Sequence, residues 1–284
     1  MHSICVWRFF IGEKIMDEQK RKKKLRIPGE IAYFAAIILL AFAVAMLTSA
    51  NFGISMIVAP AYLLSLKTGF LSFGQAEYVI QAGVFIVLCI VLRKFKLVYL
   101  SSFATCLIYG AVLDLWRLLP CFDHAVTQPG SMDLWIRIVM FVAGVLLTAF
   151  SVALFFKTYL YPQVYDFFSK AVSSKYGIKI SVFKTAFDLT CLTASVIMTY
   201  CFFGKLVGVN WGTLVMAIIN GTLIGFFSSV LDKTCDFTPI FRKFAALFEL
   251  DKKEVPAEQK REQTTDEQLK ESQAEEKEEG VSRN

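Results

Sequence analysis

Histidine is nearly absent from this sequence. Only His2 and His124 occur, and none of the seven cysteines belongs to a CxxC pair or lies near a histidine in a zinc-binding spacing. Zinc sites and disulfide frameworks depend on such spacings, so the sequence predicts neither. We expect no bound metal and no cofactor.

Catalytic motifs are missing as well. The sequence contains no GxGxxG, GxxxxGKS/T, HExxH or GxSxG pattern. These patterns mark dinucleotide, phosphate, metalloprotease and hydrolase sites. No histidine lies in an apolar segment, where it could act as a base for a serine nucleophile. We therefore expect that the protein is not an enzyme.

Charge is scarce and unevenly distributed. Charged residues make up 19% of the chain and apolar residues 56%, against about 25% and 45–50% in soluble domains. Residues 31–50, 138–156 and 206–231 contain no charge at all. Each is about as long as a helix that crosses a bilayer, and backbone groups in lipid must pair within the segment. The sequence predicts an all-α, multi-pass membrane protein.

Six membrane spans are predicted. They cover residues 31–50, 75–92, 97–116, 138–156, 181–204 and 207–231. The second span contains Glu77, and the fifth contains Lys184 and Asp188. A five-span alternative would omit one of these two.

The spans divide the chain into five regions. Residues 1–29 form a basic tail, 30–132 and 133–232 two three-helix halves, 233–250 an interfacial amphipathic helix, and 251–284 a disordered charged tail. The basic tail next to a span is typical of a topology anchor. The expected partner is the lipid bilayer, and no nucleic acid is expected.

The two halves show signs of an internal repeat. Ser65 and Gly69 recur 108 positions later as Ser173 and Gly177, and the lengths of the loops match between the halves. Three spans per half place the halves in opposite orientations, which is the inverted-repeat plan of many secondary transporters. The alternative is that two triplets of apolar helices resemble each other by chance.

The connectors after the first span of each half are unusual. Residues 51–74 are too apolar for an exposed loop and predict a re-entrant segment interrupted at Pro60, or a half-helix on the surface. Residues 163–176 are amphipathic at helical spacing. They predict an interfacial helix or a half-helix that lines a site.

A set of short motifs resembles a known family. The motifs are Asn51–Ser55, Thr68–Gly74, Leu107–Gly110, Tyr176–Ser181, Asp188, Gly212–Leu214 and Asn220–Gly221. In this order they resemble the YczE/YitT-like group of bacterial inner-membrane proteins. The resemblance implies a location in the bacterial cytoplasmic membrane and no defined reaction. The family's acidic loop has no acid in the first half, where Met56–Val58 stand, and retains Asp166 in the second.

Asp188 is the leading candidate for a functional side chain. It lies about 10 Å into its span at 1.5 Å per residue, where an ionisable group is costly and indicates function. Lys184, one turn earlier, could instead neutralise it as a structural pair. Gln81 occupies the matching place in the first half. The remaining candidates for a substrate or ion site are Glu77, Tyr109, Asp166 and Asn220.

Two classes of function remain open. The first is a transporter or permease for an unidentified small solute or ion, with its site between the repeats. The second is a non-transporting regulatory, sensing or assembly protein, which the charged tail and amphipathic segments would suit. A homodimer or a membrane partner protein is compatible with either class.

Lysine and arginine in the short loops predict that both termini are cytoplasmic. The inner loops then hold Lys20–Arg26, Arg93–Lys96, Lys157, Lys170, Lys175 and Lys179. The outer loops hold only Lys67, Arg117, Arg137 and Lys205.

Reporter fusions test this topology. Fusions after residues 95 and 250 should report a cytoplasmic location, and a fusion after residue 125 an external one, because six spans alternate the side of each loop. Any other pattern removes a span and the inverted arrangement with it.

Overall fold

The computed structural model describes residues 24–93, 99–122, 132–160, 162–178 and 180–241. Most of the basic N-terminal run, His124 and the predicted tail at 251–284 lie outside these residues.

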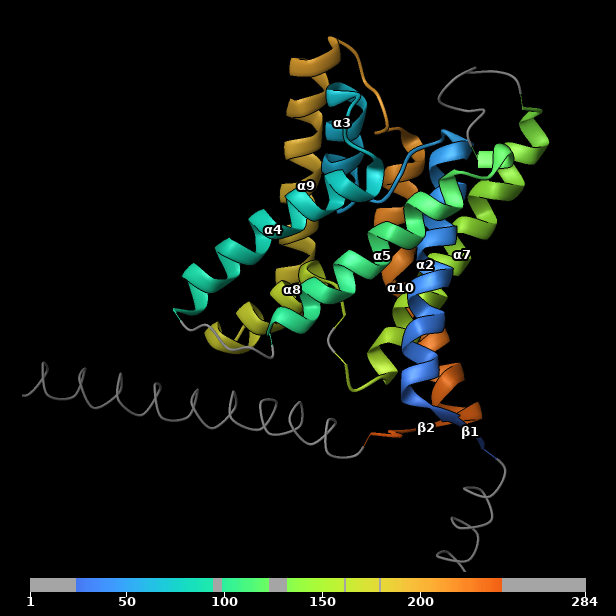
Figure 1. The fold of residues 1–284 in the computed structure, drawn as a ribbon, viewed down its shortest axis with the longest axis vertical. Helices are drawn as coiled ribbons and strands as arrows, with labels where there is room; N and C mark the ends of the chain where they lie inside the picture. The colour runs from blue at the N-terminus through green and yellow to red at the C-terminus, as the bar shows by residue number, and fades with distance from the viewer. Residues whose placement is uncertain (1–23, 94–98, 123–131, 161, 179, 242–284) are drawn as a thin grey trace, which may run out of the picture. The chain divides into compact units, whose positions relative to one another are not determined.

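Along the chain, one long helix, one short helix and two long helices occur in this order twice (Figure 1). They are α2 (Gly29–Ala50), α3 (Ala59–Thr68), α4 (Phe73–Leu92), α5 (Leu100–Arg117), α7 (Leu134–Lys157), α8 (Val164–Tyr176), α9 (Ile180–Phe203) and α10 (Trp211–Thr234). Two short strands, β1 (Leu25–Pro28) and β2 (Cys235–Thr238), flank them.

Five of the described helices are long and apolar enough to cross a membrane: α2, α4, α7, α9 and α10. The predicted multi-pass helical fold is confirmed. The two spans that the sequence marked as weakest, now α4 and α9, both qualify. Among the helices at the six predicted spans, the one that does not qualify is α5, whose 18 residues include Asp114 and Arg117. The sixth span therefore stays a prediction for α5.

The chain forms two compact units. The boundaries fall after Ser55, Leu107, Leu160, Lys205 and Ile240. Unit 1 contains β1, α2, the C-terminal part of α5, α7, α10 and β2. Unit 2 contains α3, α4, the N-terminal part of α5, α8 and α9. Each unit thus takes elements from both of the halves that the sequence suggests.

In unit 1, α2 packs along α7, and α7 packs on α10. Figure 1 shows α2 and α7 side by side. Small residues allow this approach: a Cβ added at Gly144 of α7 would lie 2.8 Å from Cγ of Leu47 and 3.2 Å from the carbonyl oxygen of Ala43. Membrane helices commonly pack through small residues, because lipid gives little hydrophobic drive for helix association.

The C-terminal end of α2 meets the first turns of α7 and α10. Nε of Arg137 in α7 donates to the carbonyl oxygen of Ala50 at 2.9 Å, which satisfies a group that the helix end leaves unpaired. Its guanidinium lies 4.6 Å from the centre of the Phe52 ring. The carbonyl oxygen of Phe52 accepts from the N–H of Gly212 in α10 at 2.9 Å. Three helix ends are therefore joined through four residues.

The segment after α10 differs from the prediction. The sequence predicts an amphipathic helix over 233–250, but α10 ends at Thr234 and the chain continues as β2, while residues 242–250 lie outside the described part. β2 pairs in parallel with β1, with Leu25 opposite Cys235. The backbone groups of this segment are thus satisfied by a neighbouring strand rather than by a helical turn.

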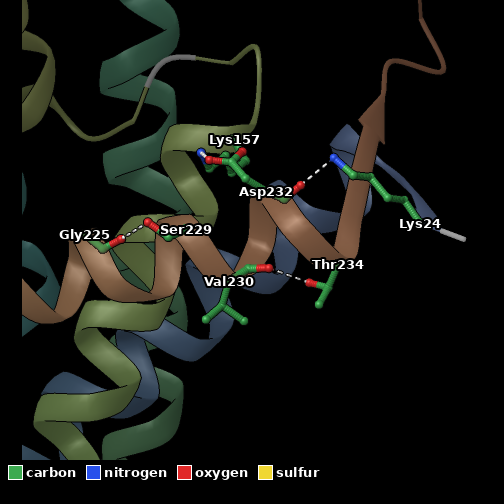
Figure 2. Close-up of polar contacts among 7 residues, drawn as sticks. All are labelled: Lys24, Lys157, Gly225, Ser229, Val230, Asp232 and Thr234. Carbon is green, nitrogen blue, oxygen red and sulfur yellow. Dashed lines mark hydrogen bonds and ion pairs between the residues drawn. The ribbon is translucent and has the colours of Figure 1, made fainter. Parts of the chain in front are cut away.

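Asp232, near the C-terminal end of α10, contacts one residue at the end of α7 and one residue just before β1. Its carboxylate pairs with Nζ of Lys157 at 2.7 Å, and its carbonyl oxygen accepts from Nζ of Lys24 at 2.5 Å (Figure 2). The side chain of Asp232 is 64% exposed, so the ion pair contributes little to stability.

In unit 2, the short helices α3 and α8 each contact both α4 and α9. Both end on a glycine in the left-handed region, with φ of 67° at Gly69 and 64° at Gly177. The N–H of each glycine donates to the carbonyl oxygen four residues earlier, that of Ser65 or Ser173. The two copies of the suggested repeat thus share the same local structure. Their orientation across a membrane stays a prediction.

Each connector contains a short helix. Pro60 does not interrupt the first one, because it lies in the first turn of α3, where no N–H is needed. In α8, seven residues are buried. This helix packs against α4 and α9, and its place relative to a membrane stays a prediction.

Two glycines of α10 allow a matched test of the unit 1 contacts. A Cβ at Gly212 would lie 2.5 Å from the carbonyl oxygen of Phe52 and 2.8 Å from the Phe141 ring, whereas a Cβ at Gly221 meets nothing within 4 Å. We expect Gly212→Ala to lower stability by about 1–3 kcal/mol through overpacking. Gly221→Ala should be neutral or slightly stabilising. Thermal unfolding in detergent measures both, and equal melting temperatures would contradict the close contact at Gly212.

Candidate functional site

A buried polar cluster joins α4 to the beginning of α8. It comprises Glu77 and Gln81 of α4 and Gln163 and Tyr165 at the start of α8, and we call it the Glu77 cluster. Glu77 and Gln81 are both 0% exposed. Since α4 is apolar enough to cross a membrane, this is an exceptional place for a carboxylate.

The amide of Gln81 holds the cluster together. Its Nε2 donates to Oε2 of Glu77 at 3.0 Å and to Oε1 of Gln163 at 3.2 Å. Its Oε1 accepts from the N–H of Val164 at 3.2 Å. Val164 is the first residue of α8, and a helix leaves its first N–H groups without intrahelical partners. A side chain from α4 therefore satisfies the start of α8.

Tyr165 makes the second contact with the carboxylate. Its hydroxyl donates to Oε2 of Glu77 at 3.1 Å. Burial, reinforced by the nearby Glu77, raises the pKa of the Tyr165 phenol well above its usual value, so the hydroxyl keeps its proton and acts as a donor. Oε2 of Glu77 thus accepts two hydrogen bonds, both from neutral groups.

Two atoms of the cluster are buried without a partner among the described residues. They are Oε1 of Glu77, an acceptor, and Nε2 of Gln163, a donor. Buried polar atoms are rarely left unpaired, and an exception calls for an explanation such as a function.

A second cluster lies on α8 and α9. It comprises Asp166, Lys184 and Asp188, and we call it the Lys184 cluster. Nζ of Lys184 pairs with Oδ1 of Asp166 at 2.6 Å. The sequence suggests Asp188 as the partner of Lys184, but the contact is made with α8 instead. Asp188 stays close enough to attract Lys184 electrostatically, while its Oδ1 is buried without a hydrogen-bond partner among the described residues.

The two clusters are neighbours. Tyr165 and Asp166 are consecutive residues in the first turn of α8, and each reaches one of the clusters. The Phe187 ring of α9 lies 6.4 Å from the Tyr165 ring. The Cys191 thiol of α9 is within electrostatic range of Glu77 as well as of Asp188. The first turn of α8 therefore links a neutral hydrogen-bonding cluster to a charged one.

The formal charge of the two clusters is negative. If all the groups are ionised, three carboxylates (Glu77, Asp166 and Asp188) face the single ammonium of Lys184. Burying excess charge is expensive unless a counter-ion or a proton offsets it. The arrangement suits a cation. Among the described residues, however, no group of three or more His, Cys, Asp or Glu side chains is placed to hold a metal ion.

The structure places the sequence-predicted residues in both units. It brings Glu77 and Gln81 into contact and puts Asp166 and Asp188 around Lys184. Tyr109 and Asn220 lie in unit 1 and belong to neither cluster. The Tyr109 side chain is buried, and Oδ1 of Asn220 is buried without a partner in the described part. The roles of these residues stay predictions.

Sequence reasoning missed Gln163 and Tyr165. A signal for Gln163 was present: it extends the polar stripe of α8, which includes Asp166 and Lys170, one helical turn toward the N-terminus. Tyr165 gave no comparable signal, because it lies between the polar and apolar faces and its partner is 88 residues away.

The helical part of the chain matches one known family. A family model described as "Family of unknown function (DUF6198)" matches residues 27–229. The chain belongs to the DUF6198 family. The matched range contains both clusters of unit 2. No curated protein and no solved structure matches the chain. The family description assigns no activity to DUF6198 members.

The pairing of Lys184 gives a direct test of the charged cluster. Lys184→Gln should destabilise the protein by about 1–3 kcal/mol, because the Asp166 side chain, 17% exposed, loses its cation. Adding Asp166→Asn should restore most of this stability, because the Asp166 carboxylate that would lack a cation is then removed.

The matched control is the double variant Asp188→Asn with Lys184→Gln. It leaves Asp166 unpaired and should restore less stability. Thermal unfolding in detergent, read as a double-mutant cycle, measures both pairs. Better rescue by Asp188→Asn would show that Asp188 is the main partner of Lys184, as the sequence suggests.

Proposed function

We propose that this DUF6198 protein is a membrane transporter for a small cationic solute or ion, with its site in the two clusters of unit 2. The observation that carries the proposal is Glu77. This carboxylate has no exposure, is hydrogen-bonded within the described part of the chain only to neutral groups, and lies in a helix suited to cross a membrane. Such a group costs stability and is a functional-site hypothesis by default.

The charge of the clusters supports the cationic class of substrate. Lys184 is paired with Asp166, so Glu77 and Asp188 have no contact ion pair of their own among the described residues. A transported cation or proton would offset them while bound. Release would leave the charge uncompensated, which favours binding of the next ion.

The form of α8 gives further support. Transporter sites are often built at the ends of short or interrupted helices that supply free backbone groups inside the protein. The first turn of α8 supplies such groups to the Glu77 cluster, and α3 is a second short helix with a matching C-terminal glycine. The same proposal has four further parts. They are two inverted halves, a place in the bacterial cytoplasmic membrane, cytoplasmic termini and kinship with the YczE/YitT-like group.

Flux in proteoliposomes tests the transport role. Vesicles with a pH gradient and an internal pH dye would be given sodium, potassium, ammonium, guanidinium or a small diamine. We expect at least one of these cations to change the internal pH faster than in protein-free vesicles. Glu77→Gln and Asp188→Asn should each reduce that rate tenfold or more, because each removes a carboxylate that binds the transported cation or the proton exchanged for it.

Asp232→Asn is the matched control. It removes an aspartate from the exposed end of α10 in unit 1 and should leave the rate within about twofold of wild type. If no cation in this panel produces flux above protein-free vesicles, the transport proposal fails, and the non-transporting class is favoured.

A further inference from the structure

We infer that Glu77 is a proton-binding residue whose exchangeable proton resides on Oε1, and that the coupling ion of this site is H⁺ rather than a metal cation. The inference deepens the transport proposal, and the role of the proton in transport rests on that proposal. Occupancy by the proton can be tested independently.

The hydrogen bonds distinguish the two oxygens of Glu77. Oε2 accepts from Nε2 of Gln81 and from the hydroxyl of Tyr165. Oε1 is buried and has no hydrogen-bond partner, donor or acceptor, among the described residues. In a protonated carboxylic acid, the carbonyl oxygen is the better acceptor and the other oxygen carries the hydrogen. The geometry therefore matches an acid with its carbonyl at Oε2 and its hydroxyl at Oε1.

The same contacts disfavour a metal cation. Sodium, potassium and divalent ions need several oxygen ligands directed at one point. The groups that approach the carboxylate here are N–H and O–H donors, with their hydrogens toward Glu77. The amide oxygens are already engaged: that of Gln81 accepts from Val164, and that of Gln163 accepts from Gln81. A proton needs only one oxygen, and Oε1 provides it.

The titratable groups around Glu77 come from several helices. Tyr165 of α8 touches it, and the thiols of Cys106 in α5 and Cys191 in α9 are within electrostatic range. The helix α3, which also packs against α4, carries Lys67 and Tyr62. Lys67 donates to the carbonyl oxygen of Phe202, and the Tyr62 ring packs on Phe73.

The charged groups beyond this shell belong to the Lys184 cluster. Lys184 lies against Asp166, so its ammonium is committed to another carboxylate. No cation among the described residues pairs with Glu77. Neutralisation of Glu77 by a proton is therefore consistent with every group that faces it.

Infrared difference spectroscopy on the full-length protein in lipid nanodiscs tests the inference. A wild-type minus Glu77→Gln spectrum should contain one carbonyl band of a protonated carboxylic acid, present at acidic pH and absent at alkaline pH. Glutamine keeps the shape of the protonated side chain, so the variant should fold. The difference isolates Glu77 from the many carboxylates of the C-terminal segment. Asp188→Asn should retain the band.

Tyr165→Phe supplies a second signature that retains the carboxyl group. Removing the hydroxyl that donates to Oε2 weakens the hydrogen bonding of the carbonyl, so the band should shift to higher frequency. This variant also keeps the test informative if Glu77→Gln does not fold. An unshifted band would show that Oε2 is not the carbonyl oxygen and would overturn the assignment of the proton to Oε1.

Three further outcomes would overturn the inference. They are a spectrum without the Glu77 band, a band that persists at every pH, and a titration midpoint that moves when sodium replaces potassium. The first would leave Glu77 ionised, the second permanently protonated, and the third would indicate a metal cation. A titrating Glu77 band in a protein without flux would instead retain the proton site and defeat the transport proposal alone.

Discussion

The side-chain amide of Gln81 makes three hydrogen bonds from a fully buried position, and the arrangement of unit 2 depends on them. They fix the carboxylate of Glu77, the side chain of Gln163 and the first N–H of α8 relative to one helix. An amide in an apolar surrounding loses about 1–3 kcal/mol for each buried partner left unpaired. The start of α8 is therefore held in one place. From there Tyr165 contacts Glu77 and Asp166 contacts Lys184.

The two copies of the suggested repeat have ionisable or amide side chains at matching positions, but these side chains have different partners. Glu77 and Gln81 of α4 are four residues apart, as are Lys184 and Asp188 of α9, 107 positions later. The first pair meets amide and phenol groups, and the second meets the carboxylate of Asp166. Asp166 has an apolar counterpart, Val58, 108 positions earlier. Among the described residues, this difference leaves Glu77 with neutral partners and gives Lys184 a carboxylate partner from α8.

Unit 1 has a different character. Its helices approach through alanine and glycine, and its polar contacts are concentrated at the helix ends: Arg137 at one end of α2, Asp232 beside the strands at the other. The interior of the α2–α7 contact contains no ion pair among the described residues. The Glu77 cluster and the Lys184 cluster, by contrast, both lie in unit 2.

The sequence alone determined the features that depend on local composition. Charge-free runs such as 31–50 predict spanning helices because the bilayer demands length and apolarity. The recurrence of Ser65 and Gly69 as Ser173 and Gly177 indicated a repeat, and glycine favours the left-handed helix cap found at both places. The prominence of Asp188 followed from its depth in an apolar segment. These properties belong to residues that are close together in the chain.

Only the tertiary structure decided which side chains meet. Local spacing offered Asp188 to Lys184, yet the contact went to Asp166, because α8 packs against α9. Gln163 and Tyr165 joined the cluster because the start of α8 meets α4 more than 80 residues away in sequence. The segment after α10 became a strand because β1, some 210 residues earlier, offered a backbone to pair with. Which side chains pair depends on how helices and strands that are distant in sequence pack together. Neither hydropathy nor spacing along the chain specifies that packing.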